Sequence, residues 1–284
     1  MNANRRAIVL GSFGAMLASG VRAAAPNEPT PSLRTGTTKA FTTPVIWVLP
    51  AETKATTRLV IWLGGGISKM ESTLPMLERL AREGFAAVSF DSWERGSRLT
   101  EPAESFVPKA FANFPMAWPV YANGAMESLR VFDWAAKEFG LKPPFSIGGF
   151  SAGGDIAIAA AGLDSRIQCV ATIVSTPDWT RPGMHLQGKL VASGEPDAYA
   201  RYLYDRINPL TNLKSYAHRP AMTLECGEKD DHVPADGALR FQAALAPIYG
   251  DAKSRLRVNV HPGVGHGASS AMFDNCVSWF KEYA

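Results

Sequence analysis

Short runs of β-branched and other apolar residues alternate along the chain with longer stretches in which apolar residues recur at every third or fourth position. This alternation is typical of helices that pack over a mostly parallel β-sheet, so it predicts an α/β fold. The runs with the length and composition of strands are residues 45–49, 58–63, 86–90, 145–149, 167–174, 221–225 and 256–260.

Two of the helical stretches end at a glycine, a residue that often follows the last turn of a helix. Leu74, Leu77 and Leu80 recur at helical spacing before Gly84, and apolar residues do so from 126 to 135, ahead of a second glycine. An apolar face at this spacing ordinarily packs against a core. We therefore interpret both stripes as structural.

Two connections, residues 97–121 and 176–219, are longer than the usual link between elements. Segments of this length often form lids or binding surfaces. Their large apolar side chains are consistent with a small cap that covers an acyl pocket. The same side chains would also suit the edge of the core. These side chains are Phe106, Phe111, Phe114, Met116, Trp118 and Trp179.

Length and composition bear on the number of domains. A chain of 284 residues with 46% hydrophobic residues can bury the core of one large α/β domain. We expect this domain at residues 41–284, after a flexible lead-in at 24–40 that is rich in proline and threonine.

An export signal is predicted at residues 1–23. Arg5 and Arg6 precede an apolar stretch at 7–21, and alanines follow at 23–25, which is the order of a signal peptide and its cleavage site. The paired arginines also suit the twin-arginine route. The stretch is short for a membrane span, so an uncleaved anchor is the less favoured alternative. We expect a periplasmic or secreted protein without membrane attachment after cleavage.

Charge argues against nucleic acid as a partner. The formal charge of the chain is +3, and removal of Arg5, Arg6 and Arg22 with the signal lowers it to zero. Affinity for a phosphate backbone requires clustered Lys and Arg side chains, which such a protein lacks.

The three cysteines, Cys169, Cys226 and Cys276, are too few for a disulfide framework, even in an oxidising compartment. Two of them lie in apolar runs. We expect buried free thiols, with a single disulfide as the alternative.

Residues 149–153 have the pattern G-x-S-x-G, in which a tight turn between a strand and a helix exposes a serine hydroxyl. The pattern is short enough to occur by chance, but here an apolar strand precedes it and an alanine-rich helical stretch follows. Ser151 is therefore the predicted nucleophile. A serine hydroxyl is a poor nucleophile at its ordinary pKa, so it needs a base and an orienting acid.

Candidates for both partners follow later strands. Asp230 comes just after the strand at 221–225, at the edge where ligands meet an open α/β sheet. Its neighbour Asp231 is the alternative acid and is expected to face solvent. His266 follows the last strand in a glycine-rich loop and can accept the serine proton when neutral. The order Ser151, Asp230, His266 is the order of α/β-hydrolases.

Among the other histidines, His232 is the main competitor for the role of base, because it adjoins the acid loop. His261 belongs to the end of the last strand, and His185 and His218 lie in the predicted cap.

Gly64, Gly65 and Gly66 follow the strand at 58–63. An α/β-hydrolase supplies one backbone N–H to the oxyanion at this point, and the residue after the nucleophile, here Ala152, supplies the second. A phosphate-binding loop is the other explanation. It is weaker, because the chain has neither the Lys-Ser/Thr pair of a P-loop nor a complete G-x-G-x-x-G here.

Together these segments resemble the α/β-hydrolase superfamily, in particular its small bacterial carboxylesterases related to dienelactone hydrolases and to the prolyl oligopeptidase catalytic domain. The resemblance implies ester hydrolysis of a small molecule through an acyl-enzyme, with no metal and no cofactor. It is carried by the elbow at 149–153, the acid loop at 227–234, the base loop at 262–266, and Phe90-Asp91 followed by Gly96-Ser97-Arg98.

One departure from this family concerns the oxyanion loop, where relatives carry His-Gly and this chain has Gly64-Gly65. Aligning Gly64 with that histidine makes Gly66 the donor, which we prefer, whereas aligning Leu63 with it makes Gly65 the donor. The histidine braces the loop in relatives, so its loss suggests a weakened oxyanion hole.

We expect a carboxylesterase that acts on short acyl esters, because the cap is small. The alternatives are a serine peptidase of prolyl oligopeptidase type, an acetyl-polysaccharide or feruloyl esterase, and an inactive hydrolase fold used for binding. The acyl and alcohol groups and the oligomeric state do not follow from the sequence.

Overall fold

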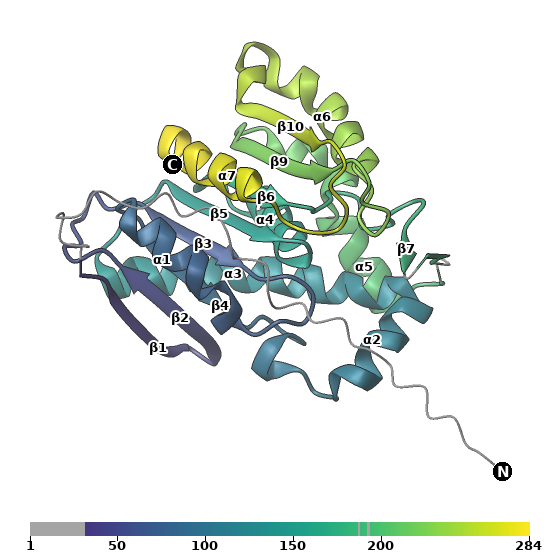
Figure 1. The fold of residues 1–284 in the computed structure, drawn as a ribbon, viewed down its shortest axis with the longest axis horizontal. Helices are drawn as coiled ribbons and strands as arrows, with labels where there is room; N and C mark the ends of the chain where they lie inside the picture. The colour runs from purple at the N-terminus through teal and green to yellow at the C-terminus, as the bar shows by residue number, and fades with distance from the viewer. Residues whose placement is uncertain (1–31, 187, 192–193) are drawn as a thin grey trace. The chain divides into compact units, whose positions relative to one another are not determined.

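Eight strands form the central sheet in the computed structural model, which describes residues 32–186, 188–191 and 194–284. The order across the sheet is β1-β2-β4-β3-β5-β6-β9-β10 (Figure 1). The strands are β1 Arg34–Ala40, β2 Thr43–Leu49, β3 Leu59–Leu63, β4 Ala86–Phe90, β5 Phe145–Phe150, β6 Ile167–Ile173, β9 Ala221–Gly227 and β10 Leu256–His261. The predicted signal peptide at 1–23 and the lead-in residues 24–31 lie outside the described residues.

The sheet is mostly parallel, as predicted. β2 is antiparallel to β1 and β4, and all pairs from β4 to β10 are parallel. Each predicted strand is present, with ends that differ by at most two residues. β-branched and apolar residues buried on both faces account for these strands, because the sheet is covered on both sides.

Helices cover the two faces of the sheet, and Figure 1 shows α1 and α7 in front of it and α3 behind. Met76, Leu77 and Leu80 of α1 pack with Met272 and Phe280 of α7 in one buried cluster. The larger cluster on the other face contains the apolar side chains of α3, α4 and α6. The helices are α1 Leu74–Arg82, α2 Ala103–Ala112, α3 Trp118–Phe139, α4 Ala152–Leu163, α5 Ala198–Ile207, α6 Asp236–Tyr249 and α7 Ser270–Tyr283.

Strand β1 corrects the prediction of a flexible lead-in at residues 24–40. Residues Arg34–Ala40 pair with β2 instead, and a tight turn at Phe41 and Thr42 joins the two strands. Most of β1 is exposed on both faces, so no alternation of apolar and polar residues marks it. Main-chain pairing at the sheet edge is what holds it in place.

The two long connections contain regular structure. The first includes α2, two short 3₁₀ helices and the first residues of α3, and the second includes α5 and a small hairpin of β7 His185–Leu186 and β8 Lys189–Leu190. The Trp118 indole donates to the carbonyl of Trp179 at 2.8 Å, which joins the two segments. They form the small cap predicted from the sequence.

The aromatic side chains of the cap mostly pack against one another. Phe114, Trp118 and Trp179 are buried, and the Trp118 and Tyr204 rings lie 4.2 Å apart. This arrangement agrees with the second of our two interpretations, in which the aromatics close the edge of the core. Phe111 is the exception, as described below.

The cysteines Cys169, Cys226 and Cys276 are buried and unpaired, as expected. Within the described part of the chain, no helix combines the length and the apolar character needed to cross a bilayer.

Candidate active site

Ser151 lies on the tight turn between β5 and α4, at a backbone conformation that L-residues rarely adopt (φ 51°, ψ −125°). The flanking glycines are required by close packing. A Cβ at Gly149 would lie 2.5 Å from the carbonyl carbon of Gly153, and a Cβ at Gly153 would lie 2.4 Å from the Leu63 oxygen. The strained turn therefore brings the start of α4 against the end of β3, with the Ser151 side chain at the carboxyl edge of the sheet.

His266 and Asp230 complete the arrangement predicted from the sequence. The Ser151 Oγ lies 3.1 Å from Nε2 of His266, and Nδ1 of His266 lies 2.9 Å from Oδ2 of Asp230. The second carboxylate oxygen of Asp230 accepts from the backbone N–H groups of His232 (3.0 Å) and Val233 (2.7 Å). These bonds fix a buried carboxylate that orients the imidazole, so the three side chains have the geometry of a nucleophile, base and acid.

Strand register explains why residues so far apart in the chain meet. Leu63 of β3 pairs with Gly149 of β5, so the glycine loop and the serine turn leave the sheet side by side. His261 of β10 pairs with Gly227 of β9, so the loops that carry Asp230 and His266 also leave together. All four loops start at the carboxyl edge of the parallel strands.

The acid and base loops are in direct contact. Lys229 N–H donates to the Val264 carbonyl at 2.8 Å, and a Cβ at Gly227 would lie 2.5 Å from the same oxygen. Gly263 N–H donates to the Glu228 carboxylate at 2.8 Å. The position of Asp230 relative to His266 therefore depends on the absence of a side chain at Gly227.

Asp231, the alternative acid, is exposed and contacts the cap hairpin through its carbonyl, which accepts from His185 N–H at 2.6 Å. His232, the alternative base, is not hydrogen-bonded to Ser151. Its ring packs edge-on against the His266 ring, with centroids 4.5 Å apart, and its other neighbour is Phe111 of α2 at 5.5 Å. Phe111 is thus the cap aromatic that reaches the site.

His232 is held in its neutral form. Burial lowers its pKa to about 4, and the nearby positive charge of Arg181 acts in the same direction. Its Nδ1 lies 3.3 Å from the His185 carbonyl oxygen, an acceptor that requires a proton on this nitrogen. His261 is the last residue of β10, as expected, while His185 belongs to the hairpin and His218 lies near Ile167, 3.3 Å from its carbonyl.

Of the oxyanion donors predicted from the sequence, Gly65 packs against Ser151 and Ala152 follows it directly. A Cβ at Gly65 would be 3.3 Å from the Cβ of Ser151, and Gly66 follows with a positive φ of 47°. Within the described residues, the N–H groups of Gly65, Gly66 and Ala152 have no hydrogen-bond acceptor in the protein. The N–H groups of Gly65 and Gly66 thus both remain candidates for the second oxyanion donor, beside the N–H of Ala152.

One residue near this loop escaped the sequence analysis. Arg95 is buried, and its guanidinium donates to the carbonyls of Gly64 and Gly66. The segment Asp91 to Arg98 carried part of the family resemblance, but Arg95 itself was overlooked because an arginine on a polar loop is ordinarily exposed.

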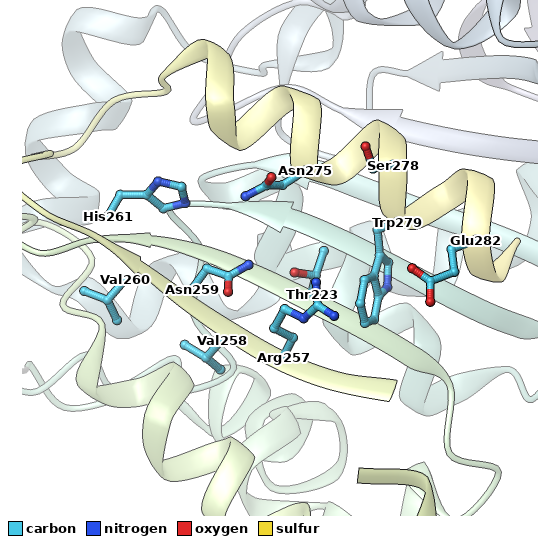
Figure 2. A pocket seen from close by; sticks show the side chains of 10 residues that line it. All are labelled: Thr223, Arg257, Val258, Asn259, Val260, His261, Asn275, Ser278, Trp279 and Glu282. Atoms are coloured by element: carbon cyan, nitrogen blue, oxygen red, sulfur yellow. The ribbon is translucent and has the colours of Figure 1, made fainter. Parts of the chain in front are cut away.

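A polar groove of about 480 Å³ runs along β10 and α7, and none of the three proposed catalytic residues lines it (Figure 2). Beneath it, the buried carboxylate of Glu225 accepts from Asn259 (2.7 Å), His261 (2.6 Å) and Asn275 (2.8 Å). These contacts link β9, β10 and α7, so they support the two strands from which the acid and base loops emerge.

Comparison with known proteins agrees with this geometry. The esterase YjfP of Escherichia coli is 25% identical over 211 residues, which are 72% of this chain and 80% of the relative. The structure of TT1662 from Thermus thermophilus superposes with a TM-score of 0.71 at 24% identity, over 88% of this chain and 98% of that protein. A Klebsiella pneumoniae protein assigned as a dienelactone hydrolase superposes with a TM-score of 0.64 at 16% identity, over 89% of this chain and all of that protein (100%).

The two structural likenesses confirm the α/β-hydrolase fold. The model of the prolyl oligopeptidase family matches residues 126–284, a stretch of more than half the chain that includes Ser151, Asp230 and His266. The chain therefore belongs to the prolyl oligopeptidase family and is a hydrolase of the esterase and peptidase group.

Proposed function

We propose that this protein is a serine carboxylesterase that hydrolyses short-chain or small esters through an acyl-enzyme. The observation that carries the proposal is the hydrogen-bonded series of Ser151, His266 and Asp230, with distances of 3.1 and 2.9 Å between neighbours. The name of the E. coli relative, an esterase, supports the same reaction class.

The first half of the reaction forms the acyl-enzyme. Ser151 Oγ attacks the ester carbonyl carbon while Nε2 of His266 takes the hydroxyl proton, and Asp230 stabilises the resulting imidazolium. The tetrahedral oxyanion accepts from the N–H of Ala152 and from the glycine loop, for which we retain Gly66 as the donor. The intermediate collapses as the C–O bond to the alcohol breaks, and His266 returns the proton to the departing alkoxide.

The second half consumes water. His266 takes a proton from a water molecule whose oxygen attacks the acyl carbon, and the same donors hold the second oxyanion. Collapse of this intermediate breaks the bond to Ser151 Oγ, which regains its proton from His266. The products are the carboxylic acid, the alcohol and the unchanged enzyme.

Small substrates are favoured by the surroundings of the base. Phe111 packs on His232, and His232 packs on His266, so an aromatic wall from the cap limits the space on that side. Ser151 itself is only 6% exposed. A long acyl chain would require the cap to move.

Labelling by a fluorophosphonate tests the proposal. The probe should modify Ser151 in the wild-type protein, as located by mass spectrometry, and labelling should weaken after His266→Ala. Turnover of p-nitrophenyl esters should decline as the acyl chain lengthens and vanish after Ser151→Ala. Hydrolysis that survives Ser151→Ala would contradict the nucleophile, and a wild-type protein that binds no probe would favour the inactive binding fold.

The family name motivates one alternative, a serine peptidase. A panel that pairs each p-nitrophenyl ester with a prolyl or aminoacyl p-nitroanilide separates the two activities. A higher kcat/KM on the anilides would replace the esterase proposal. Acetylated xylan and methyl ferulate extend the same panel to polysaccharide and feruloyl esters.

We also propose export to the periplasm or medium, on the basis of the leader at 1–23. Expression of the full chain in a bacterial host, fractionation and sequencing of the mature N-terminus test this. A protein that keeps Met1 and stays in the cytoplasm would contradict it.

A further inference from the structure

The glycine loop at 64–66 is held by its carbonyl groups. The Arg95 guanidinium donates to the Gly66 oxygen through Nε at 2.6 Å and to the Gly64 oxygen through a terminal nitrogen. The Gly65 oxygen accepts from the Ser68 N–H at 3.0 Å. Each of the three consecutive carbonyls thus has a donor, and Arg95 supplies two of them.

Fixing the carbonyls also fixes the N–H groups. In a trans peptide the C=O and the N–H of one unit point in opposite directions. The Gly64 carbonyl is held toward Arg95, so the Gly65 N–H points away from Arg95, and the bond between Gly65 and Ser68 orients the Gly66 N–H in the same manner. Neither of these two N–H groups has an acceptor among the described residues, and Gly65 packs against Ser151.

The guanidinium is itself rigidly placed. Arg95 is 3% exposed, and the next residue, Gly96, donates its N–H to the Ile67 carbonyl at 3.1 Å. Asp91 ties the same segments together, because it accepts from the N–H groups of Met70 and Ser97, each at 2.8 Å. Residues 91–97 therefore hold the glycine loop in place through these hydrogen bonds.

Arg95 also carries charge into this contact. Burial lowers its pKa to about 10, so the guanidinium stays protonated at neutral pH. A carbonyl that accepts from a charged donor polarises its peptide unit, which makes the N–H of that unit a stronger donor. The Gly65 N–H, the alternative to Gly66 as oxyanion donor, shares its peptide unit with the Gly64 carbonyl, whereas Arg95 holds Gly66 through the carbonyls on either side of the Gly66 N–H.

We propose that Arg95 is a positioning residue for the oxyanion hole. Arg95 holds the loop at 64–66 so that the N–H groups of the loop face the oxyanion of the tetrahedral adduct on Ser151. This role rests on the proposed esterase function. It takes the place of the bracing histidine that relatives carry and this chain lacks. If Arg95 braces the loop in this way, the weakened oxyanion hole suggested by the sequence is not expected.

Steady-state kinetics on p-nitrophenyl acetate test the role, with Arg95→Met, Arg95→Lys and the matched control Arg98→Met. Arg98 lies on the same turn and donates to the Asp91 carbonyl (3.2 Å) and the Glu127 carboxylate (2.6 Å), but it does not touch the glycine loop. Arg95→Met should lower kcat by roughly 10- to 100-fold with KM within about twofold, because a misplaced donor acts on the transition state. Arg95→Lys should fall between Arg95→Met and the wild type, and Arg98→Met should keep wild-type kcat.

Circular dichroism and fluorophosphonate labelling of Ser151 normalise each rate to folded, reactive protein. A folded Arg95→Met with wild-type kcat overturns the role, as do equal losses of kcat in Arg95→Met and Arg98→Met. If Arg95→Met does not fold, Arg95→Lys decides, and wild-type kcat there overturns the role. Absence of ester turnover in a labelled wild-type protein contradicts the esterase proposal itself, and the role of Arg95 falls with it.

Discussion

At the scale of single residues, the acid partner of His266 is the sharpest question, because two aspartates stand side by side. Asp230 is buried and bonded to the imidazole, whereas Asp231 is exposed and lacks that contact. Because both residues are aspartates, the same substitution at each position serves as a control for the other.

Asp230→Asn should lower kcat by about four orders of magnitude, by analogy with the effect of the same substitution in serine proteases. There the loss arises because the imidazole adopts the wrong tautomer. Asp231→Asn should leave kcat nearly unchanged. Initial rates on p-nitrophenyl acetate measure both. A larger loss for Asp231→Asn would reassign the acid.

His232 makes stability depend on pH. Its folded-state pKa of about 4 is below its ordinary value of 6.5, so the unfolded chain takes up a proton between these values while the folded protein does not. Stability due to this group is therefore complete above about pH 6.5 and declines as the pH falls toward about 4. Urea midpoints at about pH 7 and about pH 5 should differ less in His232→Gln than in the wild type. An equal difference in both proteins would show that His232 titrates normally.

At the scale of elements, the contact between the acid and base loops decides the alignment of the active site. Gly227 ends β9 where the Val264 and Gly265 carbonyls come within 2.6 Å of the place of a Cβ, whereas a Cβ at Gly267 meets nothing within 4 Å. Neither glycine has a positive φ, so the two positions differ in space and not in backbone strain.

Gly227→Ala should push the two loops apart and lower kcat by about 100-fold, since displacement of a catalytic group by about 1 Å has an effect of this order. Gly267→Ala should retain activity within a few-fold. Comparison of kcat for the two folded variants measures the effect. Full activity of Gly227→Ala would mean that the loops adjust without loss of alignment.

At the scale of the whole molecule, a buried ion pair connects the cap to the nucleophile helix. Arg181, in the connection after β6, pairs with Asp155 of α4, and the two side chains are 2% and 0% exposed. The Arg181 guanidinium also lies over the rings of Phe114 and Tyr121, 5.1 and 5.6 Å from their centroids. The cap and helices α3 and α4 thus meet at one buried charge pair.

Arg181→Met should destabilise the protein by about 3–5 kcal/mol, because it leaves a buried carboxylate without its partner. Arg166→Met is the control, since Arg166 pairs with Asp133 and Asp164 while its own side chain is 41% exposed. Loss of such an exposed pair is expected to change stability by at most about 1 kcal/mol. Urea unfolding followed by tryptophan fluorescence measures both, and similar midpoints would show that the buried pair adds little.

Much of the fold was predictable because its strands and helices are encoded locally. Buried strands such as Ala86–Phe90 require apolar residues on both faces, and the turn around Ser151 requires glycines at fixed offsets. The order of Ser151, Asp230 and His266 along the chain then sufficed to anticipate that these side chains meet. Their catalytic roles remain for the labelling and mutant experiments to test.

The amino-acid sequence alone established the elements of the buried sheet and the residues at the ends of its strands, since periodicity and turn chemistry act over a few neighbouring positions. Only the tertiary structure revealed β1, which pairs through its main chain and is mostly exposed, and the bonds from Arg95 to loop carbonyls 29 and 31 residues away. Contacts of that kind leave no periodic pattern. They exist because parallel strands bring distant loops to one edge of the sheet, where buried donors and acceptors must find partners.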